Sequence, residues 1–412
     1  MSSQLHKRFT DDQVKMLFGL YEKRVISLPQ VLQQLGCSRP RFFQLLKRYR
    51  VDPEAFTITY GRHDPQHRLS ARLDQVIREE LERDKRLVDA RDMPVWHYNY
   101  RAVRDSVVRR THRAISAQTV RNRARQWGYW WPKKKLEKRM PREVATEAIG
   151  MLLQHDTSTH RWSPYVSVTW DLITTLDDHS RYLLYADLVA KETTWAHIKA
   201  LRAVALRYGI GLSYYVDSYS VFRYVCHGQS YWRRQRLTTD AVPTQWRRVV
   251  EKCKMQVIFA LSAQAKGKVE RPYRWLQDRI VRRCAHDHIT DLDSARSILQ
   301  DERQRYNEHQ VHSTTKETPA ARFQRAIREG RNCFRPFQIS DPYTSDKDIF
   351  CLHEFRKVNG YNQIAWEGHK IPVPVKVPAK TNLELHVIPH AQRTEVRLWH
   401  ENKVIKVVYF KA

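Results

Sequence analysis

The sequence predicts a multidomain protein in which two α-helical units precede an α/β core and a small C-terminal β-barrel. The chain has 412 residues, more than a single hydrophobic core usually holds. Its apolar spacing is helical up to residue 131, mixes strand and helix patterns over 145–325, and is strand-like over 345–412. A basic, proline-bounded stretch at 132–144 separates the helical part from the mixed part and predicts a linker.

The charge of the chain indicates a polyanionic partner. Lys and Arg number 73 against 44 Asp and Glu, which gives a formal net charge of +29 and an isoelectric point near 10. A field of this sign attracts nucleic acid, because each Lys or Arg that replaces a counterion on the phosphate backbone adds affinity. We therefore expect a nucleic-acid-binding protein.

Two classes of protein are disfavoured by simple patterns. No stretch approaches the roughly 18 uninterrupted apolar residues of a membrane span, and the start, MSSQLHKRF, lacks an apolar signal core. The six cysteines are scattered without a C-x-x-C pair, which argues against a disulfide scaffold and against a Cys-based zinc site. We expect no membrane association and a reducing, cytoplasmic compartment.

Residues 1–60 predict a helix-turn-helix domain. Ser27 is a plausible N-cap for a helix over 28–35, the residues at 36–38 form a tight turn, and a basic helix follows. The second helix of such a motif can enter the major groove, so its basic residues Arg39 and Arg41 are candidate DNA contacts.

Residues 61–131 predict a second unit of the same kind. An amphipathic helix over 69–85 precedes a helix-turn-helix pattern over 99–128, with Ser116 as the cap of the final helix. That helix is expected to expose three arginines, of which two are candidate DNA contacts: Arg121 and Arg125, with Arg123 between them. A solvated basic surface without DNA contact is the alternative.

The α/β core is expected over 145–325. Apolar runs at 149–158, 165–180, 181–190, 211–218 and 253–261 predict strands, the second and third of them paired in a hairpin. Helices are expected over 193–209, with Gly209 as the stop, and over 264–285. Several short strands after residue 345, including a hairpin that turns at Glu401 and Asn402, predict the small barrel.

Three acids of the core are expected at exposed ends of elements. Asp156 and Asp217 end predicted strands, and Glu270 lies early on the long basic helix. Carboxylates that converge on one edge of a sheet are hard oxygen ligands suited to Mg²⁺, and a pair of such ions can catalyse phosphodiester displacement. Four neighbouring acids compete for this role on chemistry alone: Asp171, Asp177, Asp178 and Asp187.

Four strings in this core, in this order, carry a family resemblance: HDTSTHRW, TLDDHSRYLLYADL, YYVDSYSVFR and SAQAKGKVERPYRWLQDRI. Together they resemble the integrase-core transposases of bacterial insertion sequences, relatives of retroviral integrase and of phage Mu transposase. The last string is the most specific, because the pattern S-x-Q-x-x-G-x-V-E is typical around the family's glutamate. The resemblance implies a ribonuclease H-like catalytic core of the DDE type.

Carried over by position, the resemblance makes Asp156, Asp217 and Glu270 the catalytic, metal-binding acids. It places Asp177 and Asp178 on a structural hairpin turn and leaves Asp171 as the weaker rival of Asp156. Four basic residues beside the glutamate match, or extend along the helix, a region that touches substrate DNA: Lys266, Lys268, Arg271 and Arg274. The implied cofactor is two Mg²⁺ ions, for which Mn²⁺ can substitute, and the implied assembly on DNA is a homodimer or larger.

Two features depart from the retroviral pattern. Asp217 and Glu270 are 53 residues apart (270 − 217), a longer spacing than in retroviral integrases, and the extra segment 221–250 is basic and aromatic. It could hold flanking or melted DNA, since aromatic side chains stack on unpaired bases, or fold over the core. The retroviral His-His-Cys-Cys zinc module is also missing, and the helix-turn-helix pair occupies its place.

The implied activity is transposition in a bacterial, nucleoid-associated setting: binding of transposon ends, metal-dependent strand cleavage, and transfer of the 3′-hydroxyl to target DNA. Two alternatives remain: a DNA-binding regulator with an inactive core, and a ribonuclease H-like nuclease that cuts without joining. A nucleic-acid chaperone is a third, weaker one. Intact acids at all three positions argue against the regulator, and the tandem helical units argue against the nuclease.

Overall fold

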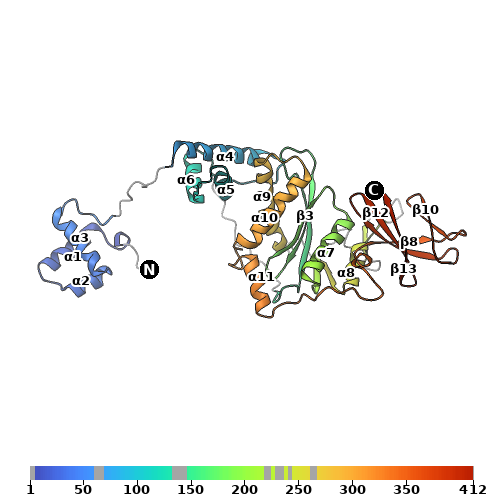
Figure 1. Cartoon of the computed structure of the whole chain (residues 1–412). Coiled ribbons are helices and arrows are strands. Elements are labelled where there is room, and N and C mark those ends of the chain that lie inside the picture. The colour runs from blue at the N-terminus through green and yellow to red at the C-terminus, as the bar shows by residue number, and fades with distance from the viewer. Residues whose placement is uncertain are drawn as a thin grey trace. The chain divides into compact units, whose positions relative to one another are not determined.

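The structure is a computed structural model that describes residues 5–59, 69–131, 146–217, 224–227, 236–239, 244–259 and 267–411. Of residues 224–227, 236–239 and 267–271 only the backbone is described. The chain divides into two compact units, Met1–Ala71 and Arg72–Ala412 (Figure 1). Within the ranges given, every helix is too short or too polar to span a lipid bilayer.

The first unit is a small helical bundle. It contains the 3₁₀ helix η1 (Leu5–Lys7) and the helices α1 (Asp11–Glu22), α2 (Leu28–Leu35) and α3 (Arg39–Val51). Gly36 ends α2 in the left-handed conformation, with φ of 58°, so the chain turns directly into α3. Phe18 and Phe42 meet edge to face at 5.6 Å in the fully buried core. The predicted helices and turn are therefore present, and their DNA-binding role stays a prediction.

The second unit begins with three helices, α4 (Ala71–Asp89), α5 (Tyr100–Thr111) and α6 (Ala117–Gln126). The Ser116 hydroxyl accepts a hydrogen bond from the backbone N–H of Thr119, as expected of the predicted N-cap. Arg123 differs from the prediction: it is half-buried, and its Nε lies 2.7 Å from Asp74 Oδ1 of α4. It joins α6 to α4 because a carboxylate on the neighbouring helix faces it.

The core is built on a five-stranded mixed sheet in the order β3-β2-β1-β4-β7. Its strands are β1 (Leu153–His160), β2 (Trp170–Asp177), β3 (Leu183–Val189), β4 (Ser213–Val216) and β7 (Gln256–Phe259). The first three pair antiparallel, and β4 lies parallel to both β1 and β7. Strands and helices are thus combined in one α/β core, and the β2–β3 hairpin lies where the sequence predicted it.

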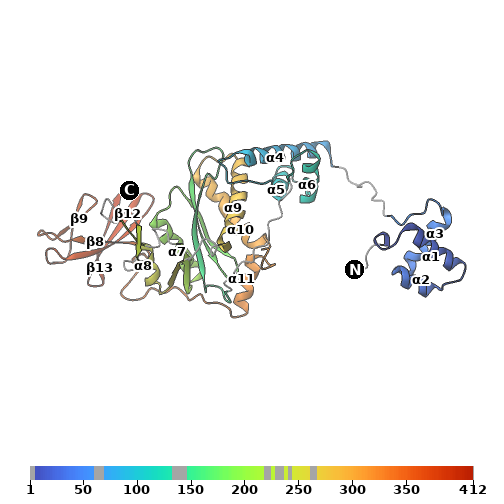
Figure 2. The same ribbon diagram turned by 180° about the vertical axis from the view of Figure 1, so that it is seen from behind.

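Helices cover both faces of this sheet (Figure 1, Figure 2). One face packs on α9 (Gly267–His286) and α10 (Leu292–His309), through buried residues such as Leu276 and Leu299. The other packs on α7 (Thr194–Tyr208) and α8 (Gln245–Lys252), through Leu201 and Trp246. The helix α11 (Pro319–Arg328) adds Phe323 to this second cluster.

Gly209 ends α7, as predicted, for a reason that the sequence does not reveal. Its φ is 102°, and a Cβ at this position would lie 2.4 Å from the backbone oxygen of Arg335. The close approach allows Ile210 and Arg335 to exchange backbone hydrogen bonds of 2.7 and 2.9 Å. Only glycine fits both the conformation and the space.

The C-terminal region follows a 3₁₀ helix, η3 (Asp346–Asp348), and is entirely antiparallel. Its main sheet has the order β13-β12-β11-β8, and a separate hairpin, β9–β10, shares its hydrophobic core. The bounds are β8 (Leu352–Lys357), β9 (Gln363–Trp366), β10 (His369–Pro372), β11 (Asn382–Pro389), β12 (Arg393–His400) and β13 (Lys403–Lys411). The β12–β13 hairpin turns at Glu401 and Asn402, both with positive φ, as predicted. The strand pairings form these two sheets, and a closed barrel stays a prediction.

The segment 221–250, for which two roles were open, is described in part. The backbone of 224–227 and 236–239 forms a two-stranded antiparallel ribbon, β5–β6. The helix α8 at its end packs into the core, where Trp246, Val249 and Val250 are fully buried. This end of the segment therefore belongs to the fold of the core, and the basic stretch 228–235 lies outside the described residues.

Candidate active site

Asp156 and Asp217 lie side by side on neighbouring strands. The parallel strands β1 and β4 pair Leu153 with Tyr214 and Gln154 with Tyr215. Continuing this register by two residues sets Asp156 beside Asp217, across strands that lie about 4.8 Å apart. Both acids are half-buried.

The prediction that Asp156 ends its strand is wrong. Asp156 is the fourth residue of β1, which continues to His160 because β2 pairs with it over its whole length. Asp217, in contrast, directly follows β4. The short strand β4 ends at Val216, which is level with the middle of β1. Asp217, the next residue, is therefore level with Asp156 although Asp156 lies inside its strand.

The face of β1 that carries Asp156 is turned toward α9. Residues two apart on a strand share a face, so Asp156, Ser158 and His160 point to the same side. The Gln277 side chain of α9 donates its Nε2 to Ser158 Oγ at 3.0 Å and lies 2.6 Å from His160 Nε2. The helix that carries Glu270 therefore runs along the Asp156 face of the sheet.

Tyr273 of α9 lies close to both aspartates. Its hydroxyl accepts a hydrogen bond of 2.8 Å from Thr174 Oγ1, and Thr174 is the cross-strand partner of Asp156. Burial raises the pKa of the Tyr273 phenol well above its ordinary value, and nearby negative charges raise it further: Asp156, Glu192 and Asp217. The phenol stays protonated and is a neutral, fixed neighbour of the acids.

Glu270 is the fourth residue of α9, and only its backbone is described. It precedes Tyr273 by three residues and Gln277 by seven, a spacing that places all three positions on one face of a helix. Tyr273 and Gln277 contact the Asp156 side of the sheet, so the position of Glu270 continues that line of contact.

The rival acids are held by structural hydrogen bonds. Asp171 accepts from Thr159 Oγ1 and from the backbone N–H of Glu192, both at 2.5 Å. Asp177 accepts from the backbone N–H groups of Gly150 and Ser180, at 2.8 Å each, and Asp178 accepts from Thr146 Oγ1 at 2.7 Å. Asp177 and Asp178 are thus structural parts of the turn, as the sequence predicted, and Asp171 fixes the chain before α7.

Behind Asp156 lies a buried chain of hydrogen bonds that sequence reasoning missed. His155 Nδ1 lies 2.9 Å from Thr175 Oγ1, and its Nε2 lies 2.8 Å from His197 Nδ1. His197 Nε2 is in turn 2.7 Å from Glu192 Oε1, and the His155 ring stacks on Trp246 at 5.9 Å. The chain fixes β1 at the residue before Asp156. No local sequence pattern predicts it, because its members come from β1, β2, α7 and the residues just before α7.

The predicted DNA-contact residues are exposed wherever their side chains are described. Arg39 and Arg41 are exposed on α3, Arg121 and Arg125 on α6, and Arg274 on α9. Aromatic rings lie under three of these guanidinium groups: Phe43 under Arg39, Tyr100 under Arg121 and Trp130 under Arg125. Lys266 lies outside the described residues, as do the side chains of Lys268 and Arg271.

The arrangement suits a divalent cation of the hard class. Carboxylate oxygens are the ligands that Mg²⁺ prefers, and the adjacent Asp156 and Asp217 supply them from two rigid strands. The hydrogen bond between Thr174 and Tyr273 on one face of the sheet, and that between His155 and Thr175 on the other, hold β1 in place at Asp156.

No family model matches the chain. Two curated proteins are similar to the chain in sequence. The candidate transposase y4bF of Sinorhizobium fredii is 26% identical over 259 residues, which cover 62% of this chain and 51% of that protein. The transposase for insertion sequence IS1202 of Streptococcus pneumoniae is 28% identical over 175 residues, 42% of this chain and 35% of that protein. The chain thus spans about half or less of the length of these relatives.

Among solved structures, catalytic cores of retroviral integrases overlap with the chain to a limited degree. The catalytic core domain of HTLV-2 integrase in complex with magnesium covers 44% of this chain and 98% of that chain, at 15% identity and a TM-score of 0.32. The core domain of BIV integrase covers the same shares, at 14% identity and a TM-score of 0.30. The chain is thus similar in sequence to two curated proteins named as transposases, one of them for an insertion sequence, which agrees with the resemblance that the motifs predicted.

Proposed function

We propose that this protein is a DDE transposase that binds transposon ends, cuts one DNA strand and joins the freed 3′-hydroxyl to target DNA. The observation that carries the proposal is the register of β1 and β4, which sets Asp156 beside Asp217 on the side of the sheet that faces α9. Glu270, on that helix, completes the set of three acids. The relatives support transposition as the process in which this site acts.

In this mechanism Asp156, Asp217 and Glu270 would hold two Mg²⁺ ions, with Mn²⁺ as a substitute. Bound there, the ions supply activation of the attacking oxygen and stabilisation of charge on the phosphate. In the cleavage step a water oxygen bonds to phosphorus as the bond from phosphorus to the 3′-oxygen breaks. The water loses a proton and the departing 3′-oxygen gains one, which leaves a 3′-hydroxyl on one strand end and a 5′-phosphate on the other. In the joining step that 3′-hydroxyl attacks a target phosphodiester. A new bond from its oxygen to phosphorus forms as the target's own bond from phosphorus to its 3′-oxygen breaks, and the attacking hydroxyl loses a proton while the released target 3′-oxygen gains one.

The remaining parts of the chain deliver DNA to this site. The exposed arginines of α3 and α6 would contact the transposon end, and Lys266, Lys268, Arg271 and Arg274 would contact DNA beside the acids. Because two ends are joined in one event, we propose a homodimer or larger assembly on DNA.

The test is a cleavage and strand-transfer assay. Labelled duplexes copied from the DNA that flanks the coding sequence are incubated with the protein in Mg²⁺, both intact and pre-cut at the 3′ end. We expect nicks at the element borders and joined products from the pre-cut ends. Cleavage without joining would instead establish a nuclease, and binding without either reaction would establish a regulator.

Tyr273 is proposed as a positioning residue for the two aspartates. Tyr273→Phe leaves Thr174 Oγ1 without its acceptor in a buried place, so the strand-cleavage rate should fall about tenfold, equivalent to about 1.4 kcal/mol. The Mg²⁺ concentration for half-maximal rate should rise as well, since the carboxylates are less well held.

The matched control for this variant is Tyr306→Phe. Tyr306 belongs to the same buried cluster, but its hydroxyl has no hydrogen-bond partner within the described part of the chain. Its loss should leave the rate and the Mg²⁺ dependence unchanged. Equal effects of the two variants would show that Tyr273 acts through packing alone.

Arg39 and Arg41 should contribute to DNA binding by neutralising phosphates. For the double variant Arg39→Ala/Arg41→Ala we expect weaker binding and a salt dependence whose log–log slope is shallower by about 0.9 for each phosphate that is no longer neutralised. Arg50→Ala is the control on the same helix, because the Arg50 Nε already donates to Glu22 Oε1 at 2.7 Å. Titration by fluorescence anisotropy at several salt concentrations measures both, and an equal change in the control would contradict the assignment.

A further inference from the structure

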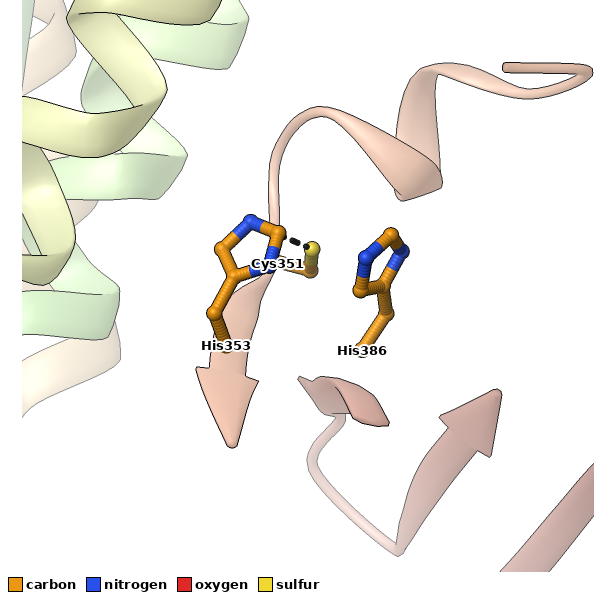
Figure 3. A group of neighbouring side chains, drawn as sticks. All are labelled: Cys351, His353 and His386. Atoms are coloured by element: carbon orange, nitrogen blue, oxygen red, sulfur yellow. Dashed lines mark hydrogen bonds between the residues drawn. The ribbon is translucent and has the colours of Figure 1, made fainter. Parts of the chain in front are cut away.

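Three buried side chains with metal-ligating atoms meet in the C-terminal region, far along the chain from the acids. They are Cys351, His353 and His386, and their ligand atoms all lie within 4.8 Å of one another (Figure 3). His353 on β8 and His386 on β11 are direct cross-strand partners, and Cys351 lies two residues before His353. The pairing of the two strands therefore brings the three side chains together.

A single carboxylate orients both imidazole rings. Glu384 Oε1 accepts from His353 Nδ1 at 2.8 Å and from His386 Nε2 at 3.1 Å. The protons on these nitrogens leave lone pairs on the opposite atoms, His353 Nε2 and His386 Nδ1. A carboxylate that accepts from the far side of the ring is the usual partner of a metal-ligating histidine.

The lone pair of His353 lies beside the Cys351 sulfur. Cys351 Sγ is 3.5 Å from His353 Nε2, close to the separation of about 3.5 Å that tetrahedral angles and zinc's bond lengths to sulfur and nitrogen give. His386 Nδ1 is buried and has no hydrogen-bond partner among the described residues. A buried polar atom without a partner costs free energy, which a ligand at this place would recover.

We propose that Cys351 Sγ, His353 Nε2 and His386 Nδ1 bind one Zn²⁺ ion, with water as the fourth ligand. A thiolate and two imidazoles are the donors that zinc takes in proteins, whereas Mg²⁺ prefers oxygen. This site is therefore distinct in chemistry from the carboxylate site of the core. Asp348 is not counted as a ligand, because Arg397 and the backbone N–H of Ser345 already bind its two oxygens.

Lys252 is the group that zinc must displace. Its Nζ lies 3.0 Å from His353 Nε2, so the ammonium donates to the lone pair that would bind the ion. The same Nζ lies 4.6 Å from the centre of the Tyr343 ring, which can hold the cation after it leaves. The His353 lone pair thus has two states, one bonded to Lys252 and one bonded to zinc.

The site lies where the core meets the C-terminal sheet. Lys252 ends α8, and Gln245 at the start of α8 exchanges two hydrogen bonds with the backbone of His353, at 2.6 and 2.8 Å. An ion bound to β8 and β11 would fix the strand that α8 contacts. The absence of a C-x-x-C pair argued against a Cys-based site, but here the ligands are gathered by strand pairing.

The test uses the full-length chain and two readouts. Purified protein that has been loaded with Zn²⁺ and dialysed should retain one zinc per chain by elemental analysis. The stripped protein, titrated with Co²⁺, should show a thiolate-to-cobalt charge-transfer band in the near ultraviolet. The band distinguishes this site from the acids of the core, which offer no sulfur, and a cysteine variant then distinguishes Cys351 from the five other cysteines of the chain.

Cys351→Ala should abolish the band, and Cys284→Ala, at another fully buried cysteine, should keep it. Glu384→Gln should weaken zinc binding about 10- to 100-fold, and it tests the site even if Cys351→Ala does not fold. A wild-type protein that gives no band, or a band that survives Cys351→Ala, would overturn the proposal. The outcome is independent of DNA cleavage, so it stands or falls apart from the proposed transposase activity.

Discussion

Asp217→Asn should reduce both strand cleavage and strand transfer at least about a thousandfold, equivalent to about 4 kcal/mol of barrier. The change removes one negative charge and one ligand oxygen from the Asp156–Asp217 pair, which the register of β1 and β4 sets side by side. Metal-assisted displacement depends on carboxylate ligands that hold the ions. Binding to the transposon end should stay within about twofold, since the exposed arginines that would make it are untouched. Gel-based cleavage and fluorescence anisotropy measure the two effects.

Asp187→Asn is the matched control for that variant. Asp187 is also an acid at a sheet strand, but it lies on β3, its side chain is 23% exposed, and it pairs with Arg296 of α10 at 3.3 Å. Its substitution should leave cleavage unchanged. Substantial activity in Asp217→Asn, or equal losses in the two variants, would refute the assignment of the site.

The largest effect on stability is expected from Asp105→Ala. Asp105 of α5 is nearly buried, and its carboxylate meets three arginines: Arg279 of α9 at 2.6 Å, Arg305 of α10 at 2.5 Å and the adjacent Arg104 at 2.8 Å. Its loss leaves the buried Arg279 guanidinium without a counter-charge. Breaking a buried pair from one side costs about 3–5 kcal/mol in the free energy of unfolding.

Chemical unfolding followed by tryptophan fluorescence measures this loss. Asp89→Ala is the control, because Asp89 and Lys85 pair on the exposed surface of α4, where such pairs contribute about 0–1 kcal/mol. The double variant Asp105→Leu/Arg279→Met should recover much of the stability, since apolar residues of similar size replace buried charges at little cost. A loss in Asp105→Ala no larger than in the control would contradict the buried-pair interpretation.

The same cluster explains a difference between sequence and structure in the second helical unit. The sequence predicted a DNA-binding unit at 61–131, and its helices and its Ser116 cap are present. Asp105, Asp84 and Asn99 of this unit, however, bond to Arg279, Arg282 and Asp278 of α9. The unit is therefore joined to the helix that carries Glu270. Charges on one element reveal nothing about their partners on another until the fold places them.

The sequence alone determined what depends on local order. Spacing and caps predicted the helices of the first unit, the β2–β3 hairpin and the end of α7 at Gly209, because each rests on residues a few positions apart. The strings around Asp217 and Glu270 identified the family resemblance that the relatives confirm. For Asp156, the sequence predicted the residue as a candidate but placed it at the end of its strand. In the structure that strand, β1, continues to His160.

Tertiary structure decided what depends on pairing between distant segments. The parallel register of β1 and β4 sets Asp156 level with Asp217, 61 residues later (217 − 156), and the packing of α9 brings Tyr273 and Gln277 to the same face. Cross-strand pairing likewise gathers Cys351, His353 and His386, which no spacing rule connects. The same physical reason applies to the strand register, to the packing of α9 and to the cluster around Cys351. Backbone pairing and core packing fix distances between residues far apart in the chain, and a sequence pattern records only the distances along it.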